Sequence, residues 1–369
     1  MPNGKPPFRA DHVGSLLRPI PLREARAARA EGKVTPEALR GIEDTHIKAV
    51  IAEQKAIGLK AVTDGEFRRA FWHFDFLAGL GGVEMYRSDQ GIQFKGGQTA
   101  AYGLKVTGRI HYAPHSFVQD YAFVHANAGG AVPKITIPSP SVLHFRGGRR
   151  AVDTHTYPEM DGFFTDLGNA YAEAVADFAK AGCRYLQLDE VNIAYLCDPE
   201  QIAGLKARGE ETEGLLGKYA ALINRAIDGR PKDMTVSMHL CRGNFRSMHI
   251  AAGGYDPVAE VLFNGINVDA YFMEYDDERS GSFAPLRFLP KGKTVVLGLV
   301  TSKRGELETK DLLKRRIEEA AKHAPLDQLA ISPQCGFAST EEGNLLTVEE
   351  QWAKLRLCVE VAEEVWGSV

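Results

Sequence analysis

Residues 170–190 read AYAEAVADFAKAGCRYLQLDE and join a helical pattern to a dense apolar run. Apolar side chains recur at helical spacing between residues 157 and 180, and Gly182 ends that pattern. The apolar run at 183–189 follows at once. Parallel strands buried on both faces are nearly continuously apolar. The stretch therefore predicts a helix followed by a strand of a parallel sheet.

The same alternation extends along the chain. Helical patterns separate most of eight dense apolar runs, and such alternation is typical of a parallel α/β sheet. Eight strands predict a (β/α)8 TIM barrel rather than an open sheet. The apolar runs lie at 9–13, 59–64, 133–138, 183–189, 234–240, 268–275, 294–300 and 328–332. The helical patterns lie at 21–31, 35–57, 157–180, 199–227, 309–323 and 348–366.

The segment at 67–131 does not fit this alternation. It is rich in Gly, Tyr and Gln and favours a hairpin at 92–112. We expect an insertion between the second and third strands, over the mouth of the barrel. No low-complexity tract or Ser/Pro-rich linker divides the chain, so residues 1–369 are predicted to form a single barrel domain.

The composition indicates a globular protein of the cytoplasm. Lys and Arg number 44 against 48 Asp and Glu, and 44% of the 369 residues are hydrophobic, which excludes disorder and gives no support for nucleic-acid binding. No run approaches the roughly 18 to 20 apolar residues of a membrane span. The N-terminal MPNGKPPFRADHVGS lacks the apolar core of a secretory signal. Five cysteines are too few, and odd in number, for a disulfide framework, so reduced thiols are expected.

Polar and ionisable residues collect at the ends of the apolar runs. In a barrel the carboxyl ends of all strands meet at one rim, where active sites of this fold lie. Residues far apart in the sequence are therefore expected to converge there. They are Gly14 and Ser15, 64–66, Ser139, Asp189 and Glu190, His239 and Cys241, Glu274, 301–304 and 333–335.

His239 and Cys241 lie two residues apart, so on a strand their side chains point to the same side. Imidazole and thiolate are preferred ligands of Zn²⁺, and Cys335 after the last run could supply a third. These three groups leave a fourth position open to exchange, which Glu274 could fill at rest. On spacing alone, a histidine and a cysteine packed in the core remain the alternative.

These residues resemble the catalytic half of cobalamin-independent methionine synthase, and more closely the short single-barrel relatives of that enzyme. The resemblance covers essentially the whole chain. The family's His-x-Cys, Glu and Cys motifs are matched by MHLC at 238–241, FMEY at 272–275 and PQCG at 333–336, and the interval of 61 residues from Glu274 to Cys335 fits the family. The resemblance implies a Zn²⁺ cofactor held by His239, Cys241, Glu274 and Cys335.

The resemblance also implies a homocysteine site. The family's Ile-Gly-Ser turn resembles Val13, Gly14 and Ser15, its glutamate after the second strand resembles Glu66, and its Asp-Glu pair resembles Asp189 and Glu190. Carboxylates such as Glu66 and Asp189 would pair with the ammonium group of an amino acid. Backbone N–H groups and the Ser15 hydroxyl could take its carboxylate.

The position of the family's catalytic histidine, counted back from Cys335, holds Lys303. Lys303 and Asp189 are therefore the candidate catalytic groups, and Lys303 could provide a proton or a positive charge to the leaving group. A solvated pair of charges, Lys303 and Arg304, is the alternative. The family's folate-stacking tryptophan region resembles residues 141–145, which contain no tryptophan, and Tyr195 stands where the family has an acidic residue.

Three functions follow from these features. The first is a zinc-dependent S-methyltransferase of methionine biosynthesis, which methylates homocysteine from methyltetrahydrofolate or another small methyl donor. The second is a zinc alkyltransferase that uses another thiol, such as coenzyme M. The third is a non-catalytic barrel with a structural zinc, because Glu274 would complete a closed set of four ligands. The expected partners are a small thiol and its donor, with no nucleic acid or membrane, and an oligomer is compatible with the sequence.

Overall fold

The computed structural model of the protein describes residues 5–89 and 91–369. Residues 1–4, which begin the segment predicted to lack a secretory signal, lie outside the described residues. The strands are β1 (Ala61–Val62), β2 (Gly81–Arg87), β3 (Gln93–Phe94), β4 (Gly97–Gln98), β5 (Tyr102–His111), β6 (Val132–Pro133), β7 (Ile135–Pro138), β8 (Tyr185–Glu190), β9 (Thr235–Leu240), β10 (Ala270–Glu274), β11 (Thr294–Val300) and β12 (Leu329–Pro333).

The main sheet is a barrel of parallel strands. Six strands pair in the order β12-β11-β10-β9-β8-β7, and β1 pairs with β6, which directly precedes β7. Ala10, in the first predicted run, forms a parallel bridge to Ile331 of β12. At the remaining seam, the Thr63 hydroxyl donates a hydrogen bond to the Gly14 carbonyl at 2.7 Å. The predicted (β/α)8 TIM barrel is therefore confirmed, with the run at 9–13 as its first strand.

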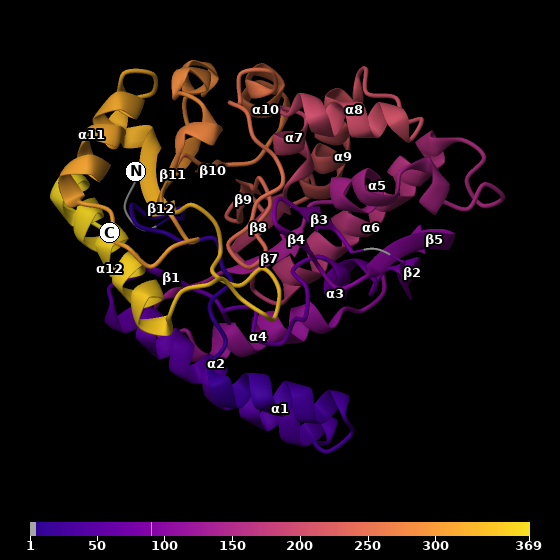
Figure 1. Ribbon diagram of the computed structural model, residues 1–369, viewed down its shortest axis with the longest axis horizontal. Helices are drawn as coiled ribbons and strands as arrows, with labels where there is room; N and C mark the ends of the chain where they lie inside the picture. The colour runs from indigo at the N-terminus through magenta and orange to yellow at the C-terminus, as the bar shows by residue number, and fades with distance from the viewer. Residues whose placement is uncertain (1–4, 90) are drawn as a thin grey trace.

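Helices surround this barrel, as Figure 1 shows for α2, α4, α6, α9, α10, α11 and α12. The helices are α1 (Ile20–Ala30), α2 (Pro36–Ala56), α3 (Phe74–Leu77), α4 (Ser116–Asn127), α5 (Ser141–Gly147), α6 (Met160–Lys180), α7 (Asn192–Tyr195), α8 (Pro199–Ala207), α9 (Leu215–Ile227), α10 (Ala259–Gly265), α11 (Lys310–Ala321) and α12 (Val348–Trp366). Short 3-10 helices are η1 (Arg149–Ala151), η2 (Glu278–Ser280), η3 (Ala284–Phe288) and η4 (Leu326–Gln328).

Local caps fix where the long helices begin. The Thr35 side chain accepts a hydrogen bond from the Ala38 N–H at the start of α2, and Pro36 occupies the first turn. At the start of α12, Thr347 and Glu350 form a capping box, in which each side chain accepts from the other residue's N–H. These polar starts leave the apolar face of each helix free to pack on the barrel.

Two expectations about the elements were wrong. The single helix at 199–227 is instead α8 and α9, because Gly209 and Gly214 adopt positive φ angles of 82° and 70° and break the helix between them. The predicted hairpin at 92–112 is also different. β5 pairs antiparallel with β2, while β3 and β4 form a separate short hairpin. The distant partner β2 could not be found from periodicity, because its outer residues are exposed.

The segment between β1 and β6 carries these antiparallel strands and α4. The β2-β5 ladder packs beside α5 and α6, at the edge of the barrel (Figure 1). Helix α4 contacts α2 and β6, so it takes the place of the barrel helix between the second and third strands. The extra strands thus lie beside the rim of the barrel, near α5.

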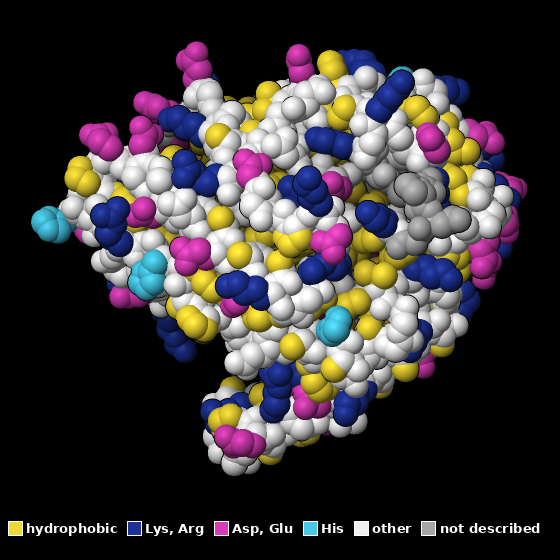
Figure 2. All heavy atoms as spheres, turned by 180° about the vertical axis from the view of Figure 1, so that it is seen from behind, with side chains coloured by type: hydrophobic (Ala, Val, Ile, Leu, Met, Phe, Trp, Pro, Cys, Tyr) yellow, Lys and Arg dark blue, Asp and Glu magenta, His cyan; other side chains and the backbone are white. Residues whose placement is uncertain are grey.

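The core lies inside the strands and between strands and helices. Every residue of β8 to β12 is buried, which explains their nearly continuous apolar character. On the face drawn in Figure 2, acidic and basic side chains are interspersed, without a broad region of one sign. Within the described residues, no helix combines the length and apolar character that crossing a bilayer requires.

Candidate active site

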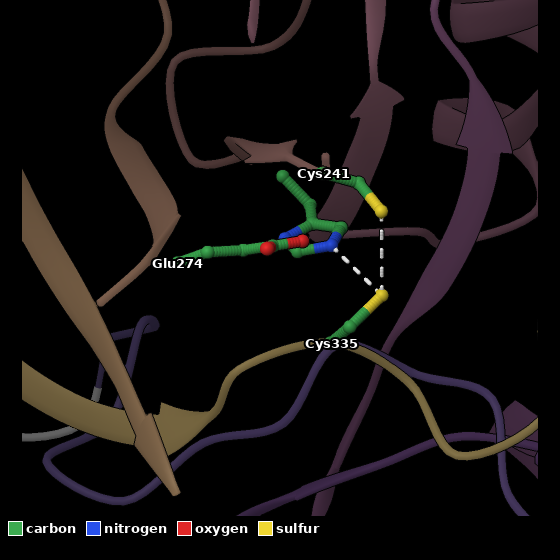
Figure 3. Close-up of side chains that lie close together, drawn as sticks. Cys241, Glu274 and Cys335 are labelled. Carbon is green, nitrogen blue, oxygen red and sulfur yellow. Dashed lines mark hydrogen bonds between the residues drawn. The ribbon is translucent and has the colours of Figure 1, made fainter. Parts of the chain in front are cut away.

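Four predicted ligands converge at the carboxyl end of the barrel. The side chains of His239, Cys241, Glu274 and Cys335 are all buried, and their ligand atoms all lie within 4.8 Å of one another. Figure 3 shows Cys241, Glu274 and Cys335 pointing toward one another; Glu274 ends β10, whereas Cys241 and Cys335 follow β9 and β12. We call these four residues the metal cluster.

The strands fix the directions of these side chains. His239 lies near the carboxyl end of β9, beside Phe272 of β10, and its Nδ1 lies 3.3 Å from the Phe272 carbonyl oxygen. This contact turns Nε2 toward the Cys335 sulfur, 3.3 Å away. Cys241 follows two residues later, and its sulfur accepts a hydrogen bond from the Gly243 N–H at 3.2 Å. The Arg242 N–H holds Oε1 of Glu274 at 2.9 Å.

The distances in the metal cluster fit a tetrahedral zinc ion. Zn–S bonds of about 2.3 Å and Zn–N bonds of about 2.0 Å place two sulfurs about 3.8 Å apart and a sulfur and a nitrogen about 3.5 Å apart. The sulfurs of Cys241 and Cys335 lie 3.5 Å apart, slightly closer than that. Oε2 of Glu274 is buried and forms no hydrogen bond within the described residues. The cluster therefore offers two sulfurs, a nitrogen and a carboxylate oxygen to a borderline-soft cation.

Within the metal cluster, the pKa values of Glu274 and Cys335 are lowered, whereas that of Cys241 is raised well above its usual range by its hydrogen bond with Cys335 and by burial. Burial would raise the pKa of Glu274, but Lys303, Arg279 and Arg242 outweigh it and lower that pKa. The hydrogen bond between the sulfurs of Cys241 and Cys335, with His239 beside them, holds the pKa of Cys335 well below its usual range. These lowered pKa values favour negative charge on Glu274 and Cys335, in a buried site where a divalent cation can neutralise it.

A pocket opens beside the metal cluster. The lining combines three of the cluster residues with acidic, aromatic and amide side chains. It consists of Val13, Ser15, Glu66, Trp72, Phe94, Arg146, Asp189, Val191, Tyr195, His239, Cys241, Gly243, Asn244, Cys335, Gly336 and Ser339.

Two buried carboxyl groups, Glu66 and Asp189, face the pocket, and we call them the acidic pair. Burial raises the pKa of Asp189 to about 7, and the nearby Glu66 adds to the rise. Burial also raises the pKa of Glu66, although Arg69, 3.6 Å away, opposes it. Oε2 of Glu66 is buried without a hydrogen-bond partner in the described chain. The acidic pair is therefore short of positive charge.

Backbone strain aims Glu66 at the pocket. Glu66 has φ 62°, a left-handed backbone conformation that residues other than glycine rarely adopt. Its N–H donates to Asp64 at 2.8 Å, and its carbonyl accepts from the Arg18 guanidinium at 2.7 Å. Gly14, with φ 140°, lies against Thr136, where a Cβ would stand 2.7 Å from a methyl group. These turns hold the wall of the pocket in place.

The other predicted residues take different positions. Val13 and Ser15 line the pocket, whereas Gly14 lies behind it. Glu190 is not in the lining; it accepts from the Ser141 hydroxyl at 2.5 Å and from the Asn192 N–H at 2.6 Å, which joins α5 to α7.

Lys303 is also outside the pocket lining. Its Nζ lies 3.4 Å from the Gly243 carbonyl and 3.4 Å from Oδ1 of Asn244, and both of these residues line the pocket. Lys303 therefore stands one layer behind the pocket wall, where its charge acts on Glu274.

Sequence reasoning missed several residues of the pocket wall. Trp72 and Phe94 come from the segment read as an insertion, and Arg146 comes from α5, which no pattern predicted. The only signal was the aromatic run FWHFDF at 71–76, which has neither strand nor helix periodicity. Asn244 and Ser339 lie in connections whose conformation no local pattern determines.

Comparisons with known proteins show the family to which the chain is similar. Residues 9–364 match the family model described as the catalytic domain of cobalamin-independent synthase. A Bacillus subtilis protein named uncharacterized protein YxjH is 52% identical over 363 residues, which is 98% of this chain and 96% of that protein. The methionine synthase of Pyrococcus abyssi is 23% identical over 328 residues, 88% of this chain and 85% of that protein.

A solved structure is similar over its full length. The crystal structure of a Listeria monocytogenes protein, provisionally assigned as a vitamin-B12-independent methionine synthase, matches with a TM-score of 0.80 and 41% identity. The match covers 99% of this chain and 100% of the Listeria chain. The barrel fold is thus common to both proteins.

Proposed function

The chain belongs to the cobalamin-independent methionine synthase family, and on that premise we propose that it is a zinc-dependent S-methyltransferase that converts homocysteine to methionine. The methyl donor is methyltetrahydrofolate or another small methylated molecule. This activity belongs to methionine biosynthesis. We place it in the cytoplasm, since all five cysteines are free thiols and two of them would ligate the metal.

The observation that carries the choice of homocysteine is the acidic pair. Glu66 and Asp189 share one pocket with two sulfurs of the metal cluster, and their pKa values are raised by burial. A substrate ammonium group between them would stabilise both carboxylates and give the free Oε2 of Glu66 a partner. An amino acid that carries a thiol would bring a sulfur to the metal cluster and an ammonium group to the acidic pair.

His239, Cys241, Glu274 and Cys335 would hold the zinc ion, and of these four Glu274 would be the ligand open to exchange. Bound zinc would lower the pKa of the incoming thiol and fix its sulfur in the pocket. The acidic pair binds the ammonium group, and the Ser15 hydroxyl is available to the carboxylate. These contacts orient the sulfur toward the donor's methyl carbon.

The transfer itself forms one bond and breaks one. The sulfur–carbon bond forms as the bond between the methyl group and the donor atom breaks, so the donor atom keeps the electron pair and takes up a proton. Asp189, whose pKa is about 7, can take or give a proton in this pocket. Lys303 lies behind Gly243 and Asn244 and contributes positive charge near the departing donor.

The two alternatives predict different chemistry. Coenzyme M ends in a sulfonate, and its negative charge would lie against the acidic pair. A structural zinc would keep Glu274 as a permanent fourth ligand and admit no substrate sulfur.

Zinc-edge absorption spectroscopy separates these functions. We expect the zinc-loaded protein to gain one sulfur ligand and lose one oxygen ligand when homocysteine is added. No new sulfur with homocysteine would contradict the proposal, and a new sulfur with coenzyme M alone would favour the alkyltransferase. Mass spectrometry of the thioether, with a panel of methylated donors, then identifies the donor.

A further inference from the structure

Arg279 of η2 lies against the carboxylate of Glu274, which ends β10 and reaches into the metal cluster (Figure 3). Nη2 of Arg279 is 3.5 Å from Oε2 of Glu274, the oxygen that forms no hydrogen bond within the described residues. Among those residues, Arg279 is the one basic side chain that forms an ion pair with Glu274. The carboxylate therefore borders both the metal cluster and a guanidinium group.

The other oxygen of Glu274 is held by the backbone. Oε1 accepts a hydrogen bond from the Arg242 N–H at 2.9 Å, and the whole residue is buried, with 0% exposed. One oxygen thus has a fixed partner and the other has none. Oε2 can therefore change its partner while Oε1 keeps its hydrogen bond.

The two other cations near Glu274 are engaged elsewhere. The Arg242 guanidinium donates to the Tyr255 hydroxyl at 2.7 Å and lies 3.9 Å from the centre of that ring. Nζ of Lys303 lies 3.4 Å from the Gly243 carbonyl oxygen. Arg279 is therefore the cation that is placed to bind the carboxylate.

The guanidinium group of Arg279 has donors to spare. An arginine side chain carries five N–H donors, and here Nη2 donates to Asp276 at 3.3 Å. Nε lies 3.0 Å from an oxygen of Asp277, yet it is buried and forms no hydrogen bond within the described part of the chain. The group can therefore donate to a third carboxylate.

A buried carboxylate that loses one cation needs another. A substrate thiolate that replaces Glu274 as a metal ligand would leave its negative charge behind in a site without exposure. Such a charge is strongly disfavoured unless it is paired and hydrogen-bonded. Arg279 is already 3.5 Å away, so a small movement brings it into hydrogen-bond range.

We propose that Arg279 is a positioning residue that receives the Glu274 carboxylate when the substrate sulfur takes its place on the metal. Oε2 turns to Nη2 of Arg279, while Oε1 stays on the Arg242 N–H. Asp276 and Asp277 compete with Glu274 for the guanidinium, which favours return of the carboxylate once the product leaves. This inference rests on the proposed methyltransferase function and names the residue that makes its ligand exchange favourable.

Zinc-edge absorption of the zinc-loaded full chain, titrated with homocysteine, tests this role. In Arg279→Met we expect the zinc content of the wild type, but a homocysteine concentration for half-exchange that is at least about tenfold higher, because exchange leaves the Glu274 charge unpaired. At a concentration that saturates the wild type, the variant should keep its oxygen ligand. Arg279→Lys retains the positive charge and should restore most of the exchange.

Two further variants keep the result interpretable. Arg287→Met is the matched control, since Arg287 of η3 pairs with Asp256 at 3.2 Å, outside the pocket lining, and should leave the exchange unchanged. Asp276→Asn removes one competitor for the guanidinium and should lower the concentration for half-exchange about twofold to fivefold. This opposite change tests the proposal even if Arg279→Met fails to fold.

The role of Arg279 and the proposed function can fail separately. A wild-type chain that gains no sulfur with homocysteine would overturn the methyltransferase function and the exchange at Glu274 together. Normal exchange in the wild type, with an unchanged half-exchange concentration in Arg279→Met, would overturn only the role of Arg279. An unchanged or higher concentration in Asp276→Asn would do the same.

Discussion

The metal cluster and the acidic pair share one pocket, yet their surroundings shift the pKa values of their carboxyl groups in opposite directions. In the metal cluster, neighbouring cations lower the pKa of Glu274, and the hydrogen bond with Cys241 lowers the pKa of Cys335. In the acidic pair, burial raises the pKa of both Glu66 and Asp189. The protein thus favours the negative charges of Glu274 and Cys335 in the metal cluster, whereas burial disfavours those of both carboxyl groups in the acidic pair.

This difference indicates which ligand is permanent and which is transient. Negative charge that the fold itself stabilises suits a resident cation, which binds before any substrate arrives. Carboxylates that the fold destabilises gain most from a charge that comes and goes, because the arriving ammonium relieves their desolvation. The predictions below test this division between a resident cation and a visiting one.

Removing a sulfur from the metal cluster should have the largest effect. In Cys335→Ser we expect loss of bound zinc and a fall in methyl transfer of at least about a thousandfold, because a hydroxyl is a much poorer zinc ligand than a thiolate. Metal analysis and turnover measurements check both changes together.

The control for this change is another buried thiol. Cys358 is fully buried in α12, outside the pocket, and Cys358→Ala should keep both zinc and activity. A Cys335→Ser protein that retains zinc at full occupancy would remove Cys335 from the metal cluster.

Neutralising Glu66 should come second and should affect substrate rather than metal. In Glu66→Gln we expect KM for homocysteine to rise about tenfold to a hundredfold, which corresponds to the roughly 1.5 to 3 kcal/mol of a charged hydrogen bond. Zinc content should stay unchanged. Steady-state kinetics and metal analysis on the same preparation check this.

Glu43→Gln is a matched control, since Glu43 is also a buried carboxyl group but pairs with Arg26 on the outer face of the barrel. An unchanged KM in Glu66→Gln would mean that the acidic pair does not bind the ammonium group.

Replacing Asp189 should have a smaller effect, which we expect in the free energy of unfolding. Its pKa of about 7 lies above the ordinary value of 3.8, so between about pH 4 and pH 7 the native state binds its proton more tightly than the unfolded state does. The free energy of unfolding therefore falls as pH rises through that range. Asp189→Asn should stabilise the protein by about 1 to 3 kcal/mol at pH 8 and by much less at pH 5.

Thermal unfolding midpoints at the two pH values check this prediction. Asn can still accept the hydrogen bond that the Gln187 amide now donates to Asp189 at 2.7 Å, so the substitution leaves no orphaned donor. An equal or lower midpoint at pH 8 would contradict the idea that the fold destabilises the acidic pair.

The sequence predicted the metal cluster better than the walls around it, for a physical reason. His239, Cys241, Glu274 and Cys335 follow strands whose apolar runs are unmistakable, and the barrel brings strand ends together whatever the loops do. Trp72 and Arg146 depend on irregular segments, whose positions come from tertiary packing that periodicity does not report.

Glu190 shows that prediction from sequence is also limited for residues within strands. It directly follows Asp189, but neighbouring residues of a strand point to opposite faces, so one enters the pocket while the other binds the N–H groups at Asn192 and Ile193. A motif of two adjacent acids therefore cannot place both in a single pocket.

Replacing Lys303 should have the smallest effect of the four predicted substitutions. It tests whether a charge outside the metal cluster and the acidic pair affects the reaction. Its Nζ contacts Gly243 and Asn244 rather than lining the pocket, so it reaches the reaction only through the electric field. In Lys303→Met we expect kcat to fall about fivefold, equivalent to about 1 kcal/mol, while KM for homocysteine stays constant.

Arg304→Met is the adjacent control, because Arg304 forms no ion pair in the described chain and should change neither constant. A hundredfold fall in kcat for Lys303→Met would instead indicate direct proton transfer, and the lysine would then have to move past Asn244 into the pocket during turnover.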